Sequence, residues 1–251
     1  MSPSSGSSGF AAPRLIGHRG AAALAPENTL ASIRAAADSG VFWIEVDAKL
    51  AKDGVPVLMH DDTLDRTTAG QGPVVARTSG ELGRLDAGSW FDPRFAGETV
   101  PTLAQCLAEC RRLGLGLDLE IKPDKGAEAV TAAAVLGVLD DAGWTAGDPI
   151  IVTSFAVASL RVVRDYAPTF HRGLLIWKFP DGWQDAARDL GAVAVISDQQ
   201  SLKTRADVAQ IADAGWVPMT YTVNRADRAA ELYGWGVAGV VTDDPPALKG
   251  L

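Results

Sequence analysis

The sequence predicts a single (β/α)8 barrel, a TIM-barrel fold of the α/β class, with a small insertion after its second strand. Apolar, strand-like segments alternate with segments of helical periodicity almost to the C-terminus. Strands that are apolar along most of their length are typical of a parallel sheet covered by helices. Eight such units in 251 residues favour a closed barrel over an open, doubly wound sheet. No glycine-rich phosphate loop follows the first strand, which further weakens a dinucleotide-binding alternative.

The predicted elements follow one another in a regular order. The strands are expected at 14–17, 41–48, 115–121, 150–154, 173–177, 192–197, 217–223 and 238–242, and the helices at 27–39, 103–113, 128–142, 156–166, 184–190, 205–214 and 226–233. Glycine, the residue that most often ends a helix in a left-handed turn, follows five of these helices, at Gly40, Gly114, Gly143, Gly191 and Gly215.

The N-terminal residues 1–12 are expected to form a flexible tail, because they are rich in serine and glycine and lack the charged and apolar regions of a signal peptide. The barrel domain then occupies 13–251. No apolar run is long enough to cross a membrane. The two cysteines, Cys106 and Cys110, lie four positions apart on one predicted helix, where we expect both to be reduced. So few cysteines fit a reducing compartment, and we expect a cytoplasmic location.

The first strand ends in Ile16-Gly17-His18-Arg19-Gly20, which places a histidine and an arginine side by side. The active sites of this fold lie at the C-terminal ends of the barrel strands, so His18 and Arg19 are predicted at the mouth. Glu27 and Asn28 follow in Pro26-Glu27-Asn28-Thr29, which we expect to open the first helix with capping residues and an early acid.

The second strand carries two carboxylates, Glu45 and Asp47, within an apolar run. Side chains at positions i and i+2 of a strand point to the same side, so both should converge on one spot. Buried like charges repel unless something positive lies between them. A hard divalent cation with oxygen ligands is the expected partner.

A hairpin and an insertion follow this strand. Asp53-Gly54 is a strong turn signal, and 55–60 is strand-like, so the chain should reverse and return antiparallel. This return brings His60 to the mouth. Residues 61–100 are then expected to form an irregular excursion that caps the mouth, since long insertions in compact domains are usually functional.

The third barrel strand supplies a further acid and a base. In the segment from Leu117 to Lys122, charged residues alternate with aliphatic ones, so Asp118, Glu120 and Lys122 share one face. Glu120 is predicted as the third metal ligand, and Lys122 lies one step nearer the rim. Asp118 lies deeper, where it is expected to support the ligands rather than bind the metal.

The remaining strands contribute less to the predicted site. His171 precedes a strand start, at the opposite end of the barrel, and is expected to be structural. Phe155 and Trp177 fall near the mouth, where core or rim packing is the expected role and contact with a bound substrate the alternative.

Taken together, three carboxylates, two histidines, an arginine and a lysine suit phosphoryl chemistry. The metal and the basic groups would stabilise charge on phosphate oxygens, while the histidines would manage protons. The net charge of −8, without a Lys/Arg-rich stripe, argues against nucleic acid as a partner and against stable membrane association.

Several motifs in order resemble the glycerophosphodiester phosphodiesterase family, and in particular its short cytosolic bacterial members. The match rests on His18-Arg19-Gly20 with Pro26-Glu27-Asn28-Thr29, Glu45-Val46-Asp47, Lys52-Asp53-Gly54, Pro56-Val57, His60-Asp61, Arg66-Thr67-Thr68, Asp86-Ala87-Gly88-Ser89-Trp90, Glu120-Ile121-Lys122, Tyr221-Thr222-Val223-Asn224 and Thr242-Asp243. The resemblance implies a TIM barrel that hydrolyses glycerophosphodiesters to sn-glycerol 3-phosphate and an alcohol.

By the same resemblance, the roles divide among seven residues. Those roles are metal binding for Glu45, Asp47 and Glu120, acid/base catalysis for His18 and His60, and phosphate binding for Arg19 and Lys122. The all-carboxylate ligand set favours Mg²⁺ or Ca²⁺ before Mn²⁺. Two rival functions stay open: a lysophospholipase D or phospholipase C-like enzyme acting on lipids, and a non-catalytic barrel that binds a phosphate ligand. The sequence does not decide the oligomeric state, the preferred alcohol, or which histidine is the acid.

Overall fold

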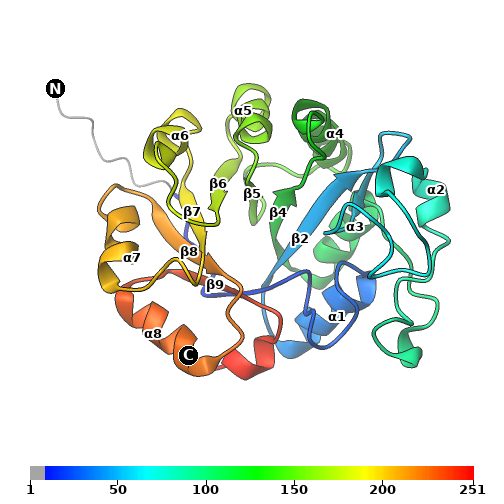
Figure 1. Ribbon diagram of the computed structural model, residues 1–251, viewed down its shortest axis with the longest axis horizontal. Coiled ribbons are helices and arrows are strands. Elements are labelled where there is room, and N and C mark those ends of the chain that lie inside the picture. The colour runs from blue at the N-terminus through cyan, green and yellow to red at the C-terminus, as the bar shows by residue number, and fades with distance from the viewer. Residues whose placement is uncertain (1–8) are drawn as a thin grey trace.

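The computed structural model describes residues 9–251, so residues 1–8 of the predicted tail lie outside the described part of the chain. Eight parallel strands close into a barrel surrounded by helices, which confirms the predicted (β/α)8 fold (Figure 1). The barrel strands are β1 (Leu15–Gly17), β2 (Trp43–Leu50), β4 (Gly116–Ile121), β5 (Ile150–Ser154), β6 (His171–Ile176), β7 (Ala194–Asp198), β8 (Val217–Tyr221) and β9 (Gly239–Thr242). Closure comes from β1, which pairs in parallel with both β9 and β2.

The helices cover the outside of the barrel. They are α1 (Leu30–Ser39), α3 (Leu103–Leu113), α4 (Glu128–Asp141), α5 (Val157–Tyr166), α6 (Trp183–Asp189), α7 (Arg205–Ala212) and α8 (Ala226–Trp235). All five glycines predicted to follow helices have a positive φ, which confirms the predicted left-handed helix ends.

The first helix begins later than predicted. Its N-cap is Thr29, whose side chain accepts a hydrogen bond from the backbone N–H of Ser32. Asn28 has a φ of 55°, outside the range of a right-handed helix, so it cannot belong to α1. The expected capping role of Glu27 and Asn28 is therefore wrong, and both side chains are free to serve the barrel mouth.

The insertion begins with the predicted hairpin. Strand β3 (Pro56–Leu58) pairs antiparallel with β2, with Lys49 opposite Val57. The excursion that follows contains one short helix, α2 (Ser79–Leu82), and 3-10 turns at Val74–Ala76 and Pro93–Phe95. Its apolar residues form a small core of their own with the hairpin, and it lies beside β2 and α3 (Figure 1).

The insertion does not cover the mouth as predicted. Within residues 9–251, none of the side chains that line the large cavity at the mouth comes from 61–100. The physical reason is that apolar insertion residues, such as Leu64 and Leu82, are buried against the hairpin at the side of the barrel. What the insertion contributes to the mouth is Asp61, which hydrogen bonds to the cavity-lining His60, and Arg66, which donates to Asp61.

The N-terminal boundary also differs from the prediction. Phe10, which lies within the predicted tail, is only 8% exposed. Its ring lies 5.2 Å from the ring of His171, the first residue of β6, and it shares an apolar cluster with Ile16 and Met219. The folded chain therefore starts at or before Phe10, which packs at the N-terminal end of the barrel. His171 lies at that same end, as predicted.

Candidate active site

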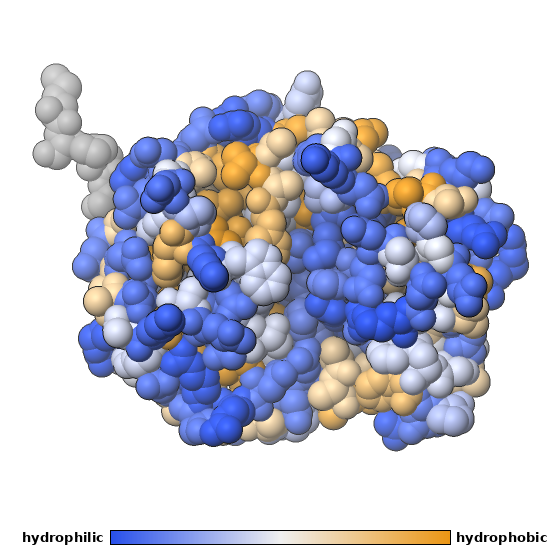
Figure 2. Space-filling model, viewed as in Figure 1, coloured by the Kyte–Doolittle hydropathy of each residue, from blue (hydrophilic) through white to orange (hydrophobic). Residues whose placement is uncertain are grey.

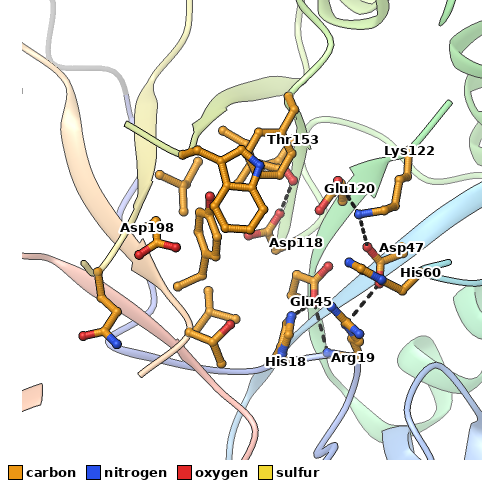
Figure 3. A pocket seen from close by; sticks show the side chains of 18 of the residues that line it. His18, Arg19, Glu45, Asp47, His60, Asp118, Glu120, Lys122, Thr153 and Asp198 are labelled. Atoms are coloured by element: carbon orange, nitrogen blue, oxygen red, sulfur yellow. Dashed lines mark hydrogen bonds and ion pairs between the residues drawn. The ribbon is translucent and has the colours of Figure 1, made fainter. Parts of the chain in front are cut away.

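A cavity of about 260 Å³ opens at the C-terminal ends of the barrel strands. Its opening is visible as a hollow in the face shown in Figure 2. The cavity is lined by all seven residues predicted for the site, together with Asp118, Thr153, Phe155, Leu175, Trp177, Ile196, Asp198, Gln199, Gln200, Tyr221, Thr222 and Val241. Figure 3 shows the charged members of this set facing one another.

Three carboxylates meet on one side of the cavity. Strands β2 and β4 pair in a register that sets Asp47 beside Glu120, and Glu45 lies two residues before Asp47 on the same face. One oxygen from each of these three acids lies within 4.8 Å of the others. All three residues are buried, with exposures of 6%, 1% and 8% for Glu45, Asp47 and Glu120.

These acids are under electrostatic strain. Burial, together with the charge of Asp47, raises the pKa of Glu45 well above its usual range and that of Glu120 to about 8. Burial also opposes ionisation of Asp47, but Arg19 and Lys122 hold its pKa below the usual range. Lys122 Nζ lies 3.6 Å from both Asp47 and Glu120. Two basic side chains thus compensate three carboxylates only in part.

The donor set fits a divalent cation. Hard carboxylate oxygens, gathered within the reach of one ion, are the ligands that Mg²⁺ and Ca²⁺ favour. The raised pKa values of Glu45 and Glu120 indicate that the site lacks positive charge, which a cation would supply. The oxygen donors of the three acids and the shortage of positive charge around them therefore both favour a bound cation.

His18 is held by an acid that directly follows the last strand of the barrel. Its Nδ1 hydrogen bonds to Asp243 Oδ1 at 2.6 Å, and its Nε2 lies 3.8 Å from Glu45 Oε2. Asp243 also accepts a hydrogen bond of 2.6 Å from Asn224 Nδ2. Burial opposes ionisation of Asp243, but the hydrogen bond with His18 keeps its pKa below the usual range. His18 is thus oriented with Nε2 toward the acids.

His60 is held in the same way by its neighbour. Its Nδ1 hydrogen bonds to Asp61 Oδ1 at 2.7 Å, and Arg66 donates to both oxygens of Asp61. Arg66 also donates to Glu27, which in turn accepts a hydrogen bond of 2.6 Å from Arg19. Burial is the main cause that lowers the pKa of His60 below its usual range. A continuous chain of charged groups therefore connects His60 to Arg19.

Arg19 carries an unusual backbone and an unused donor. Its φ is 51°, and in this conformation its backbone N–H donates to Glu45 Oε2 at 3.0 Å. Gly20 follows with a φ of 89°, and a Cβ there would lie 2.4 Å from Ser32 Oγ, so only glycine fits. Within residues 9–251, Arg19 Nε is buried and has no hydrogen-bond partner. This Nε lies 3.4 Å from Asp47 Oδ2, an ion-pair distance, and its N–H remains available as a donor to a bound anion.

Two further polar residues lie beside the acids, and one of them, Asn28, hydrogen bonds to Asp47. Asn28 Nδ2 donates to Asp47 Oδ2 at 2.8 Å, and the backbone N–H of Asp47 donates to Asn28 Oδ1 at 3.2 Å. Asp118 accepts a hydrogen bond of 2.6 Å from the hydroxyl of Thr153, and burial raises its pKa to about 7. Asp118 is not part of the group of acids that could share an ion.

Several site residues were missed as such by sequence reasoning: Glu27, Asn28, Lys49, Asp61, Arg66, Asn224 and Asp243. All except Lys49 lie in the motifs that carry the family resemblance. The motifs therefore marked these positions, but they did not indicate what each side chain does. Lys49 reaches Asp62 at 2.6 Å and Asp124 at 3.6 Å while its own side chain is 1% exposed. This ion pair joins β2 to the insertion.

Among the residues that the structure describes, no helix is long and apolar enough to cross a membrane.

Comparison with known proteins gives one consistent answer. The model of the glycerophosphoryl diester phosphodiesterase family matches residues 18–247. The glycerophosphodiester phosphodiesterase of Caldanaerobacter subterraneus subsp. tengcongensis is 33% identical over 238 residues, which cover 94% of this chain and 96% of that one. A glycerophosphodiester phosphodiesterase of Bacillus subtilis is 33% identical over 252 residues, covering 92% of this chain and 83% of the relative.

Solved structures agree with the sequence relatives. An Oleispira antarctica phosphodiesterase, solved in complex with the product sn-glycerol-3-phosphate, is 36% identical, with a TM-score of 0.91 over 95% of this chain and 96% of that one. A glycerophosphodiester phosphodiesterase from Agrobacterium tumefaciens is 28% identical, with a TM-score of 0.80 over 95% of this chain and all of that one. The chain therefore belongs to the glycerophosphodiester phosphodiesterase family, and it is a phosphoric diester hydrolase.

Proposed function

We propose that this enzyme hydrolyses glycerophosphodiesters to sn-glycerol 3-phosphate and an alcohol, with one divalent cation and a pair of histidines. The observation that carries the proposal is the meeting of Glu45, Asp47 and Glu120 with both histidines in one cavity. The Oleispira antarctica phosphodiesterase was solved with sn-glycerol-3-phosphate as its product, and it is similar to this chain over nearly its whole length.

Arg19 and Lys122 bind the phosphate in this proposal. Arg19 brings a buried guanidinium whose Nε makes no hydrogen bond among the described residues and lies 3.4 Å from Asp47, and Lys122 brings a point charge from the position after β4. Both side chains already neutralise part of the negative charge of Asp47. With phosphate and a cation bound, the two basic side chains would be divided between Asp47 and the phosphate, and the cation would supply further positive charge to the acids. Arg19 is fixed by Glu27, which favours a single orientation of the bound phosphate.

The cation would be held by the carboxylates of Glu45, Asp47 and Glu120, with Mg²⁺ or Ca²⁺ as the preferred ions and Mn²⁺ as a possible substitute. When bound, it supplies positive charge that stabilises the developing negative charge on the phosphate oxygens. Asn28 fixes the orientation of Asp47 through two hydrogen bonds, and Asp118 keeps a polar contact with Thr153 below the acids.

His18 and His60 transfer protons. We assign His18 as the base that accepts a proton from the attacking oxygen and His60 as the acid that protonates the leaving alcohol. Each ring is fixed through Nδ1 by a carboxylate, Asp243 for His18 and Asp61 for His60, which leaves Nε2 for proton transfer. The attacking oxygen belongs to water or to a hydroxyl of the substrate's own glycerol, which would give a cyclic intermediate.

The test is an assay of a panel of substrates with the full chain. Glycerophosphocholine, glycerophosphoethanolamine and lysophosphatidylcholine are incubated with chelated enzyme and with enzyme given Mg²⁺ or Ca²⁺. We expect sn-glycerol 3-phosphate from the two water-soluble diesters only when metal is present. Activity that survives exhaustive chelation would contradict the metal proposal. A preference for lysophosphatidylcholine would instead support the lipid-directed alternative.

A further inference from the structure

The cavity has two chemically different sides. The side formed by β1, β2 and β4 carries the acids, the histidines and the basic residues described above. The side formed by β5 to β8 carries three aromatic rings, from Phe155, Trp177 and Tyr221, and a single acid, Asp198. Figure 3 shows Asp198 across the cavity from Lys122 and His60. The mechanism proposed above uses none of these four residues.

The three rings form one cluster. The ring centroids of Phe155 and Trp177 lie 5.8 Å apart in a stacked arrangement, and Tyr221 packs edge-on at 5.9 Å from Phe155 and 6.0 Å from Trp177. Trp177 is 66% exposed, so of the two packing positions that the sequence predicted, the core and the rim, it occupies the rim. The hydroxyl of Tyr221 donates to the carbonyl of Ile176, so what this residue offers to a ligand is its ring.

Asp198 adds a negative charge beside these rings. It ends β7, and its Oδ1 accepts a hydrogen bond of 2.6 Å from the backbone N–H of Gln200. Among the ion pairs formed within residues 9–251, none involves Asp198, although the protein has many arginines. Its neighbours in the cavity wall, Gln199, Gln200 and Thr222, are neutral. This acid therefore lacks a positive partner among the residues that the structure describes.

We propose that the aromatic side of the cavity binds a quaternary ammonium group on the alcohol of the substrate, as in a choline ester. Aromatic rings next to an unpaired carboxylate are the arrangement that attracts a large, weakly hydrated cation. This inference rests on the proposed function, because the phosphate must be bound by Arg19 and Lys122 for the alcohol to reach the rings. The competing occupant is a neutral alcohol or the glycerol moiety, which would use the rings only as an apolar surface.

The test compares two esters of the same shape and different charge. One is glycerophosphocholine; the other is the glycerophosphodiester of 3,3-dimethylbutanol, in which a carbon atom replaces the ammonium nitrogen. We expect the value of kcat/KM to be about 10-fold higher for the choline ester, since the charge adds attraction that the neutral isostere lacks. Equal values for the two esters would overturn the proposal and leave the phosphodiesterase function intact.

Two variants assign this preference to the proposed residues. In Asp198→Asn and in Trp177→Leu, we expect the ratio of the two kcat/KM values to fall to about 2 or below. The matched controls are Asp213→Asn and Tyr166→Leu, which change an exposed acid and an exposed aromatic residue outside the cavity. Both controls should keep the wild-type ratio. A wild-type ratio in the two test variants would contradict the assignment.

A binding measurement separates the two proposals if neither ester is hydrolysed. That result would reject the proposed function. Choline should still quench or shift the tryptophan fluorescence of the wild-type protein in a saturable manner, and this change should be lost in Trp177→Leu. 3,3-Dimethylbutanol at the same concentrations should have at most a small effect. No saturable response to choline in the wild-type protein would reject the cation site itself.

Discussion

The Nδ1 atom of His18 lies 2.6 Å from Oδ1 of Asp243, although the two residues are 225 positions apart in the sequence. Gly17 pairs with Thr242 where β1 meets β9, so each residue directly follows its strand at the same end of the barrel. The pairing of β1 with β9, which closes the barrel, therefore also places Asp243 where it can orient His18. Asn224, which follows β8, holds the second oxygen of Asp243.

The first prediction concerns this pair. In Asp243→Asn, an amide replaces the carboxylate that holds Nδ1 of His18, and it can present its NH₂ group to the ring. We expect kcat/KM to fall about 10²-fold, the lower end of the usual effect of a general acid or base. Steady-state kinetics measure the loss, and a thermal melt checks that the fold is kept. A variant with at least half of the wild-type activity would show that His18 needs no acid partner.

The second prediction concerns pH. Burial lowers the pKa of His60, and the hydrogen bond that His60 donates to Asp61 partly offsets that effect by raising the pKa. In Asp61→Asn the pKa of His60 should therefore fall further. The limb of the kcat/KM profile that reports His60 should move to lower pH, whether His60 acts as acid or base.

The matched control for this profile is Asp62→Asn. Asp62 is adjacent in sequence but pairs with Lys49 instead of His60. Its profile should coincide with that of the wild-type enzyme. A shift to higher pH in Asp61→Asn, or the same shift in both variants, would disagree with this account of His60.

The third prediction concerns Asn28. Its side chain makes two hydrogen bonds with Asp47, and its φ of 55° suits glycine as well as asparagine. Asn28→Gly therefore removes the amide without straining the backbone. We expect the metal concentration for half-maximal activity to rise 10- to 100-fold, as is typical when a residue that orients a metal ligand is lost. An unchanged metal requirement would show that Asn28 is structural and does not help Asp47 to bind the metal.

The fourth prediction concerns stability. Phe10 is buried at the N-terminal end of the barrel, so Phe10→Ala should lower the free energy of unfolding by about 3 kcal/mol. Gly9→Ala is the control, because a Cβ there would contact nothing within 4 Å. Urea denaturation measures both. If Phe10→Ala were as stable as the control, the folded domain would start after residue 10.

The sequence predicted the barrel because its evidence is local. Strand ends, helix ends and the alternation of charged and aliphatic residues in Leu117–Lys122 depend on neighbours within a few positions. The facing of Glu45 and Asp47 depends only on the two-residue repeat of a strand, and parallel pairing of β2 with β4 then brings Glu120 beside them.

What could not be predicted depends on contacts between distant segments. The pairing of His18 with Asp243 needs the closed barrel, and the chain from His60 through Arg66 and Glu27 needs the position of the insertion. The first helix was predicted to start at Glu27, but it starts at Leu30. The contact of Asn28 with Asp47 overrides the local helix propensity of this segment. The insertion was predicted to cap the mouth because it is long. Its length, however, does not show where its apolar residues are buried, and they pack against the hairpin.

The central claim is that three acids bind a single divalent cation, and isothermal titration of the metal-free protein with Mg²⁺ or Ca²⁺ tests it most directly. The account predicts that the wild-type protein binds one ion per chain and that Asp47→Asn shows no measurable binding at the same concentrations. Asp47 is the best acid to change because its carboxylate is grouped with the other two acids and pairs with both basic residues. Wild-type protein that binds no ion, or Asp47→Asn that binds one with wild-type affinity, would contradict it.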